Sequence, residues 1–405
     1  MVTLRESSAL RTPFARHAIL WLLLLLAGVS ATVGAVNGMN RSQDFQWSGE
    51  RVLLQHVDPW MEYLQGDPAH RFILSQVPNY LPVLYVLLVP VGLLSLSYAK
   101  GLWVFCNLTF AVTSGFAAAR FYQFRGRSVV AIVCLLLIAT PTRNSMGNGQ
   151  QALLILMIWC LTLLTPRLTD RRACLAGISY FKFTFAPPLF LYLLFRGGLR
   201  AVVLAAIPVL AGLLLVWFWL TQGHDFHELL RLTWEPLRVA QHGYTPDRQD
   251  PNLMNLVEVF VNGGMREGAL NGLELALALV VCVPISYLAF RRHRESSVQW
   301  QMAIMATMSY TLFKHHAYDE VVLLLPLCYA LRFWRDAKAQ FTLLLLGYLL
   351  YVQRIVDAIH LHLDFAAIQF AMLVCVLALV YRMRGLEETA EPAWADFSKG
   401  VEGAH

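Results

Sequence analysis

Long apolar stretches separated by short polar segments run through nearly the whole chain. They fall at approximately 18–37, 101–121, 129–141, 151–165, 173–183, 185–195, 201–220, 269–290, 298–312, 320–332, 340–352 and 366–381. About 20 apolar residues suffice for a helix to cross the hydrocarbon core of a bilayer. The pattern therefore predicts an all-α polytopic membrane protein, a bundle of about 12 transmembrane helices.

One further apolar segment, 81–97, does not fit a simple crossing. Pro82 and Pro90 divide it, and a crossing here would place the cluster Arg120, Arg125 and Arg127 on the outer side of the membrane. Cytoplasmic loops normally carry the excess of Lys and Arg. We therefore expect 81–97 to be a juxtamembrane or re-entrant element of a first outer loop that spans residues 38–100.

With that assignment, every strong basic cluster falls on the cytoplasmic side. The clusters are Arg5/Arg11/Arg16, Arg120/Arg125/Arg127, Arg167/Arg171/Arg172, Arg196/Arg200, Arg291/Arg292/Arg294, Arg332/Arg335/Lys338 and Arg382/Arg384. They hold more than half of the 32 Lys and Arg residues, which predicts cytoplasmic N- and C-termini. Because the net charge of +6 is spread over short clusters between spans, it does not indicate a nucleic-acid partner.

Composition supports one membrane-embedded unit. The chain is 57% hydrophobic and 14% charged, and its seven cysteines lie in or beside apolar segments, so no disulfide framework is expected. The stretch 18–37 is longer than a signal-peptide core, which favours an uncleaved first helix. We expect one transmembrane domain over residues 1–385, followed by a disordered cytoplasmic tail over 386–405.

The polar stretch after the first apolar segment supplies the first candidate for chemistry. Asp44 lies just beyond the end of that segment, where partial dehydration can raise a carboxyl pKa and allow it to act as a general base. A solvated loop acid is the alternative. Asp58 and Asp67 each precede a proline, a context typical of turns. Asp58 is also a candidate for binding substrate.

Two further polar features fall on the predicted outer side. The segment 141–151 could direct Arg143, Asn148 and Gln150 toward an oxyanion or a sugar hydroxyl, or it could be a plain connecting turn. Lys182 lies between two short apolar segments, where a charge is costly unless it is paired or faces water. It is therefore a candidate point charge for a phosphate, with snorkelling to the interface as the alternative.

The segment Lys314–Asp319 gathers a cation, two imidazoles, a phenol and a carboxylate. Adjacent histidines on a helix point in different directions, so His315 and His316 are not expected to share a zinc ion. With Tyr318, they are better suited to binding a phosphate or to donating a hydrogen bond to a leaving group.

The remaining outer candidates are weaker. The long loop 221–268 offers Trp234, Tyr244 and Asn252 for contacts with a sugar, although aromatic residues also belt membranes. A last outer cluster can equally be a solvated interface loop; its members are Arg354, Asp357, His360, His362 and Asp364.

The order of these motifs resembles glycosyltransferase family 87, which comprises polyprenyl-phosphate-sugar-dependent membrane enzymes of the GT-C fold. The resemblance covers roughly residues 15–385. It rests on the order and spacing of Asp44-Phe45, Gly66-Asp67-Pro68, the P-x-L-x-x-L motif from Pro82, the A-K-G-L-W-x-x-x-N motif from Ala99, Asn148-Gly149-Gln150-Gln151, the A-G-x-x-x-x-K-F motif from Ala176, and His315-His316-Ala317-Tyr318-Asp319 ahead of Leu323-Leu324-Leu325-Pro326. Lys314 departs from the family pattern, in which an aromatic residue is common at this position.

The resemblance implies a GT-C-like bundle in a bacterial inner membrane, with an outer cavity for a lipid-linked sugar. Asp44 would be the catalytic base, and Lys182, His315 and the Gly149-Gln150 loop would line the cavity. The expected reaction moves a sugar from polyprenyl monophosphate to a hydroxyl of a lipid or glycan acceptor, with inversion. Lys182, His315, His316 and Arg143 would bind the donor phosphate.

No cofactor is predicted with certainty; a divalent metal could neutralise the phosphate, but fixed cations can do the same work. Two alternatives remain open from the residues themselves. One is a polysaccharide ligase or polymerase that uses a lipid-diphosphate donor and outer-loop arginines such as Arg231, Arg238 and Arg248. The other is a lipid or solute transporter, in which broken helices and Lys182 would serve passage of the substrate.

Overall fold

The structure, a computed structural model, describes residues 13–43, 45–243, 251–261, 267–353, 356 and 366–387, and every regular element in these ranges is a helix. The longer helices are α1 (Pro13–Arg41), α5 (Leu96–Phe121), α6 (Arg127–Ile138), α10 (Ala186–Thr221), α11 (Phe226–Gly243), α13 (Glu267–Ser286), α14 (Val298–Leu312) and α18 (Ala366–Arg382). The shorter ones are α2 (Trp47–Leu54), α3 (Pro59–Leu64), α4 (Pro82–Gly92), α7 (Thr140–Asn148), α8 (Ala152–Thr162), α9 (Asp170–Gly177), α12 (Leu253–Val261), α15 (Leu324–Arg332) and α16 (Ala337–Gly347). Single turns of 3-10 or π type are η2 (Ile178–Phe181), η3 (Phe183–Phe185), η4 (Tyr287–Arg292), η5 (Ala317–Leu323), η6 (Tyr348–Val352) and η7 (Met383–Glu387).

Five helical segments in the described ranges are long and apolar enough to cross a membrane, which makes this a multi-pass membrane protein. They are His17–Arg41, Leu96–Phe121, Phe183–Thr221, Leu270–Arg292 and Ala366–Glu387. A sixth is obtained if α6 and α7, bent by 57° at their junction, form one broken span. Other predicted crossings are shorter apolar helices, such as α8 and Ala337–Val352. The all-helical polytopic class is confirmed, whereas the count of twelve crossings stays a prediction.

The segment 38–100, predicted to be the first outer loop, contains the short helix α4 where a juxtamembrane or re-entrant element is predicted. Its 11 residues span about 16 Å, roughly half the thickness of the hydrocarbon core. α4 packs against α2 and α10, and most of its side chains are buried. Its length and its protein neighbours agree with an element that does not cross the membrane alone.

The chain between α9 and α10 breaks into the two 3-10 turns η2 and η3. Lys182 lies between them with an extended backbone, φ −102° and ψ 95°. α10 is itself interrupted at Gly198, whose φ of 73° suits glycine and falls between the predicted crossings 185–195 and 201–220. Non-helical backbone within a membrane bundle is tolerated where protein surrounds it. Because Lys182 lies in the break between η2 and η3, the direction of its side chain is not set by a helix.

The centre of the bundle is α14. All its side chains except that of Gln299 are buried, as expected for a helix that is surrounded by others on every side. α10, α13, α15 and α18 pack around it. Because α14 ends at Leu312, the segment Lys314–Asp319 follows directly from this buried central helix.

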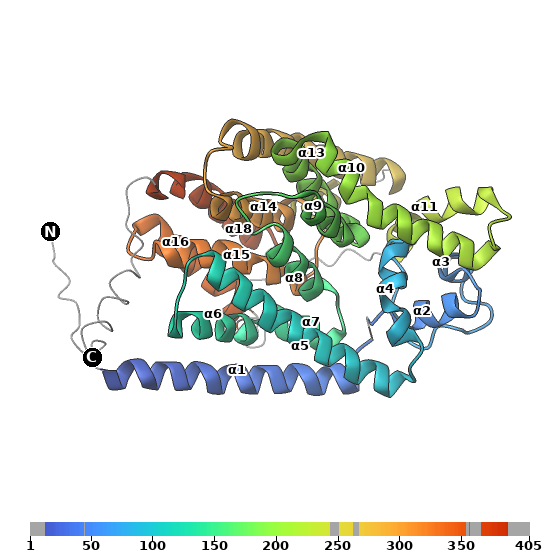
Figure 1. The fold of residues 1–405 in the computed structure, drawn as a ribbon, viewed down its shortest axis with the longest axis horizontal. Helices are drawn as coiled ribbons and strands as arrows, with labels where there is room; N and C mark the ends of the chain where they lie inside the picture. Colours follow the sequence, from blue (N-terminus) through green and yellow to red (C-terminus); the bar gives the residue numbers. More distant parts are fainter. Residues whose placement is uncertain are drawn as a thin grey trace.

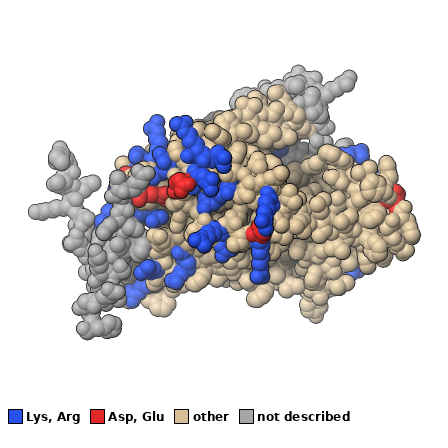
Figure 2. Space-filling view, turned by 45° about the horizontal axis from the view of Figure 1, so that its top comes forward, with Lys and Arg blue, Asp and Glu red and all other residues tan. Residues whose placement is uncertain are grey.

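The two ends of the molecule differ in charge. In Figure 1, α1 runs along the lower edge, and α2, α3, α4 and α11 gather at the end where α1 finishes. Figure 2 shows Lys and Arg crowded on the other half of the visible face, toward the end where α1 begins. This distribution supports the orientation proposed below.

Candidate active site

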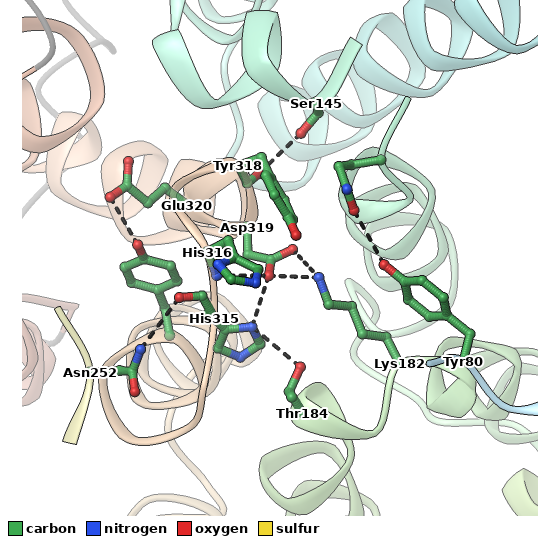
Figure 3. Close-up of polar contacts among 12 residues, drawn as sticks. Tyr80, Ser145, Lys182, Thr184, Asn252, His315, His316, Tyr318, Asp319 and Glu320 are labelled. Carbon is green, nitrogen blue, oxygen red and sulfur yellow. Dashed lines mark hydrogen bonds and ion pairs between the residues drawn. The ribbon is translucent and has the colours of Figure 1, made fainter. Parts of the chain in front are cut away.

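A buried ion pair joins the break after α9 to the turn after α14. Lys182 Nζ lies 2.6 Å from both carboxylate oxygens of Asp319, and the two residues are 8% and 0% exposed (Figure 3). Burial alone would raise the pKa of Asp319. The Lys182 ammonium and His315 lower that pKa by a larger amount, so it lies below its ordinary value. Asp319 is therefore an ionised carboxylate that holds Lys182 in place.

His315 supports this carboxylate from a second side. Its Nδ1 lies 3.2 Å from Asp319 Oδ2 and 3.4 Å from Thr184 Oγ1, and its ring packs on Phe185 and Tyr310 (Figure 3). Burial lowers the pKa of His315 more than Asp319 raises it, which favours a neutral ring that donates its Nδ1 proton to Asp319. Within the described residues, His315 Nε2 is buried without a hydrogen-bond partner.

Two side chains fix the backbone of the same segment. Asn252 Nδ2 donates to the carbonyl of His315 at 3.3 Å, while its Oδ1 accepts from the backbone of Asn255. Ser145 Oγ in α7 donates to the carbonyl of Tyr318 at 3.0 Å. Asn252, predicted to bind substrate, is 1% exposed and is placed where it orients His315.

A cavity of about 320 Å³ opens beside the ion pair. Its polar lining includes Asn79, Tyr80, Lys182, Thr184, Asn271, His316 and Asp319. Its apolar lining includes Phe183, Pro187, Leu237, Met254, Leu270, Leu275 and Phe313, which come from four helices and the segments beside Lys182 and His315. The cavity thus brings the Lys182 ammonium together with many apolar side chains.

Of the predicted site residues, the structure brings three to this cavity. Lys182, His316 and Tyr318 line it together with Asp319; the Lys182 ammonium lies 5.0 Å from the Tyr318 ring, and the His316 and Tyr318 rings are 5.3 Å apart. His315 does not belong to the lining. The two adjacent histidines therefore differ in role: His316 faces the cavity, and His315 lies behind Asp319.

The segment 141–151, predicted as a loop, is mostly helical. α7 runs to Asn148 and ends at Gly149, because Pro141 fits the first turn of a helix and Gly149 adopts the left-handed conformation that terminates one. Arg143 contacts Thr140 Oγ1 at 3.3 Å, and Asn148 is exposed. Gln150 Oε1 accepts from the hydroxyl of Tyr80 at 3.2 Å, so this segment contacts the cavity wall through Tyr80, as it does through Tyr318 by way of Ser145.

Asp44 lies outside the described residues, but the residues on either side of it are described. Ser42 Oγ donates to the carbonyl of Asn148 at 3.1 Å, and Phe45 stacks on Trp103, whose indole donates to the carbonyl of Gly149. A Cβ on Gly149 would lie 2.6 Å from Ser42 Oγ. The end of α7 and the two neighbours of Asp44 therefore form one tightly packed contact.

Several other predictions fall outside the described residues. They concern Tyr244, Arg248, the cluster Arg354, Asp357, His360, His362 and Asp364, and the tail from residue 388 onward.

Asp58 takes part in a charged cluster away from the cavity. Its Oδ1 accepts from the backbone of Trp60 and Met61, which caps α3 in the manner expected for Asp before Pro. Its Oδ2 lies 3.6 Å from Arg231, which also contacts Glu228 at 2.9 Å and Glu235 at 2.8 Å. Burial and then the charge of Glu235 raise the pKa of Asp58 to about 8.

This cluster has the donor set of a metal site, but an arginine already occupies it. The carboxylates of Asp58, Glu228 and Glu235 approach within 4.8 Å of one another. Since the Arg231 guanidinium contacts all three, it supplies the positive charge that a divalent ion would bring. Arg231 is one of the arginines that the lipid-diphosphate alternative would use to bind its substrate, and its guanidinium already contacts three carboxylates.

A second ion-pair group in the cavity wall was not predicted. Lys314 Nζ lies 2.7 Å from Glu258 Oε2 in α12 and 2.9 Å from Glu274 Oε2 in α13. Glu274 falls within a predicted crossing, where an acidic residue is itself a signal of a buried partner. That signal could have identified Glu274, but not its partner 40 positions along the chain.

Comparison with protein families gives a match to the family described as Glycosyltransferase family 87, over residues 79–314. Comparison with curated proteins and with solved structures gives no match.

Proposed function

The chain belongs to glycosyltransferase family 87 and is a membrane glycosyltransferase, and on that premise we propose that it takes its sugar from a polyprenyl monophosphate. The acceptor is a hydroxyl of a lipid or glycan, and the reaction takes place on the extracytoplasmic face of a bacterial inner membrane. The observation that carries the proposal is that the Lys182 side chain and a group of apolar side chains line the same cavity.

The shape of the cavity supports a lipid-linked donor. An ammonium can meet the phosphate, and the apolar residues Pro187, Leu237, Leu270 and Leu275 offer a surface for an isoprenoid chain. A nucleotide sugar would instead require a site for its base and its diphosphate, and no glycine-rich phosphate loop occurs in the sequence.

The proposed reaction is a single displacement at the anomeric carbon. The acceptor oxygen forms a bond to that carbon while the bond from carbon to the phosphate oxygen breaks, and the configuration inverts. Asp44 takes the proton of the acceptor hydroxyl, and polyprenyl phosphate leaves as an anion. The packing of Ser42 and Phe45 against the end of α7, two residues from the Gln150–Tyr80 contact, supports a base near the cavity.

The growing charge on the leaving phosphate is the part of the reaction that the described residues serve best. Lys182 and His316 line the cavity and can contact the phosphate oxygens. Asp319 and His315 act as positioning residues, since they hold Lys182 and are themselves 0% and 1% exposed. Fixed cations aimed at developing charge contribute strongly to catalysis because they need no reorganisation during the reaction.

The orientation follows from charge. The end of the molecule with α2, α3, α4 and α11 carries few Lys and Arg residues on the visible face (Figures 1 and 2), as expected for the outer side. Labelling of cysteines introduced at Ala69 and Gly126, which are both exposed, tests this: reagent added from outside should reach only position 69. Labelling of position 126 from outside would contradict the orientation.

The decisive experiment measures transfer of radiolabelled sugar from polyprenyl-phosphate donors in membranes that contain the full-length protein. We expect Asp44→Asn to abolish transfer while donor binding persists, because the phosphate contacts remain. Asp170→Asn is the matched control, since Asp170 is an exposed carboxylate beside Arg200 at the α9 N-terminus. Full transfer by Asp44→Asn would rule out this base, and transfer only from lipid-diphosphate donors would favour the ligase alternative.

A further inference from the structure

The cavity lining includes a second polar group, from α12 and α13. Met254 and Glu258 lie four residues apart in α12, and Asn271 and Leu275 lie four apart in α13, so each pair lies on one helix face. All four residues line the cavity. Glu258 and Asn271 are thus polar groups on two facing helices that otherwise present apolar side chains.

Glu258 is held in place but keeps one oxygen available. Its Oε2 contacts Lys314, and in the described part of the chain its Oε1 makes no hydrogen bond. Its side chain is 14% exposed in the cavity wall, whereas the side chain of Glu274, on the other side of Lys314, is 0% exposed and does not line the cavity. Lys314 therefore holds Glu258 directly and contacts Glu274 on its buried side.

The charge around Glu258 is unfavourable for a phosphate. Among the described residues, the Lys314 ammonium contacts the two carboxylates of Glu258 and Glu274, while the Lys182 ammonium contacts that of Asp319. Phosphate is repelled by excess carboxylate, but a hydroxyl group donates to it favourably. A ligand with a phosphate and several hydroxyls is consequently oriented, with its phosphate toward Lys182 and its hydroxyls toward Glu258.

We propose that Glu258, held by its direct contact with Lys314, binds hydroxyl groups of the donor sugar and determines which sugar is accepted. This inference rests on the proposed function, since it takes the ligand to be a phosphate-linked sugar. Asn271 completes the subsite, because its amide can both donate to and accept from a hydroxyl.

The test compares two variants that each remove one carboxylate from Lys314. Glu258→Gln changes the cavity wall, and Glu274→Gln changes only the buried side of the lysine. Equilibrium binding of radiolabelled polyprenyl-phosphate mannose, glucose, galactose and arabinose is measured against unglycosylated polyprenyl phosphate, with full-length protein in lipid nanodiscs. The ratio of the two dissociation constants isolates the contribution of the sugar.

For at least one sugar, we expect this ratio to favour the glycosylated lipid by about tenfold in the wild type and in Glu274→Gln, and to approach one in Glu258→Gln. Three results would overturn the proposal. The ratio could be the same in Glu258→Gln and the wild type, it could fall equally in both variants, or it could be one for every sugar in the wild type. Transfer is assayed in the same samples. Absence of transfer from every donor would contradict the proposed function, while the binding ratios still decide the role of Glu258.

Discussion

Lys182 Nζ lies 2.6 Å from both carboxylate oxygens of Asp319, so the cation best placed to meet a phosphate is already paired. A phosphate can contact this ammonium by sharing it with Asp319 or by displacing one of the two short contacts. In either case, Asp319 keeps its contact with His315 at 3.2 Å, and the carboxylate does not become an isolated buried charge.

The Lys182–Asp319 ion pair predicts that substitutions can affect the stability of the protein and its transfer activity separately. Lys182→Met leaves Asp319 buried without its cation, which should cost about 3–5 kcal/mol of unfolding free energy. Lys182→Met/Asp319→Leu removes both charges and should recover most of that loss, yet transfer should stay at least about 100-fold below wild type because the phosphate contact is gone. Thermal unfolding in detergent and a transfer assay measure the two effects.

Lys338→Met is the control for loss of a lysine, since Lys338 is exposed at the start of α16. Recovery of activity in the double variant would show that Lys182 does not contact the reacting phosphate.

The two adjacent histidines should respond differently to truncation. His316→Ala removes a group that lines the cavity and should lower kcat/KM by about tenfold to 100-fold with a small change in unfolding temperature. His315→Ala leaves a void beside Phe185 and Tyr310 and frees Asp319, so it should lower the unfolding temperature clearly. If only His316→Ala lowered the unfolding temperature, the assignment of His316 to the cavity and of His315 to the packed interior would be contradicted.

The close contact of Gly149 with Ser42 and Phe45 predicts that a side chain at position 149 would displace the residues around Asp44. Gly149→Ala adds a Cβ at a φ of 78°, at 2.6 Å from Ser42 Oγ and 2.8 Å from Phe45 Cβ. We expect a loss of about 1–3 kcal/mol in stability and a larger loss of transfer than stability alone explains. Gly28→Ala in α1 meets nothing within 4 Å and should be neutral or slightly stabilising. Unchanged activity in Gly149→Ala would separate this contact from catalysis.

Glu50 predicts a pH dependence of stability. It is 0% exposed in α2, neither carboxyl oxygen has a hydrogen-bond partner within the described residues, and burial raises its pKa from 4.5 to about 8. The folded protein therefore keeps a proton that the unfolded chain releases above pH 4.5. The contribution of Glu50 is most favourable below pH 4.5 and is lost progressively as the pH rises to about 8.

Glu50→Gln mimics the protonated form and should flatten this dependence, with its largest stabilisation relative to wild type above pH 8. Thermal unfolding from pH 5 to about 9 measures it. Glu62→Gln is the control, because Glu62 is partly exposed and contacts Arg71 at 3.5 Å. An identical pH profile for Glu50→Gln and wild type would show that Glu50 is ionised in the folded protein.

The helical membrane class could be predicted from the sequence because apolar length directly reports a bilayer-spanning helix. The same pattern could not separate short crossings from short buried helices: α8 and α15 are apolar because protein surrounds them, and periodicity does not distinguish protein from lipid. The segment 141–151 was predicted as a loop from its polar residues, although Pro141 and Gly149 are good residues for the start and the end of a helix.

Individual residues of the candidate site could be predicted from the sequence, but the contacts between them could not. Lys182 and Asp319 stand out as charges in apolar surroundings, so each could be recognised alone, but their 2.6 Å contact joins positions 137 residues apart. Glu258 and Lys314 pair over 56 residues, and no local pattern encodes that contact. The difference between His315 and His316 depends on the extended backbone between α14 and η5, which composition does not reveal.

The pairing of both cavity lysines bears on how a ligand arrives. Among the described lining residues, Lys182 and Lys314 each contact a carboxylate, so an anion must share a lysine with that carboxylate or displace it, and its net attraction is small. Weak contacts suffice when a ligand is confined to the same membrane, since confinement raises its effective concentration near the protein. The arrangement therefore favours a membrane-anchored anion over one that must be captured from dilute solution.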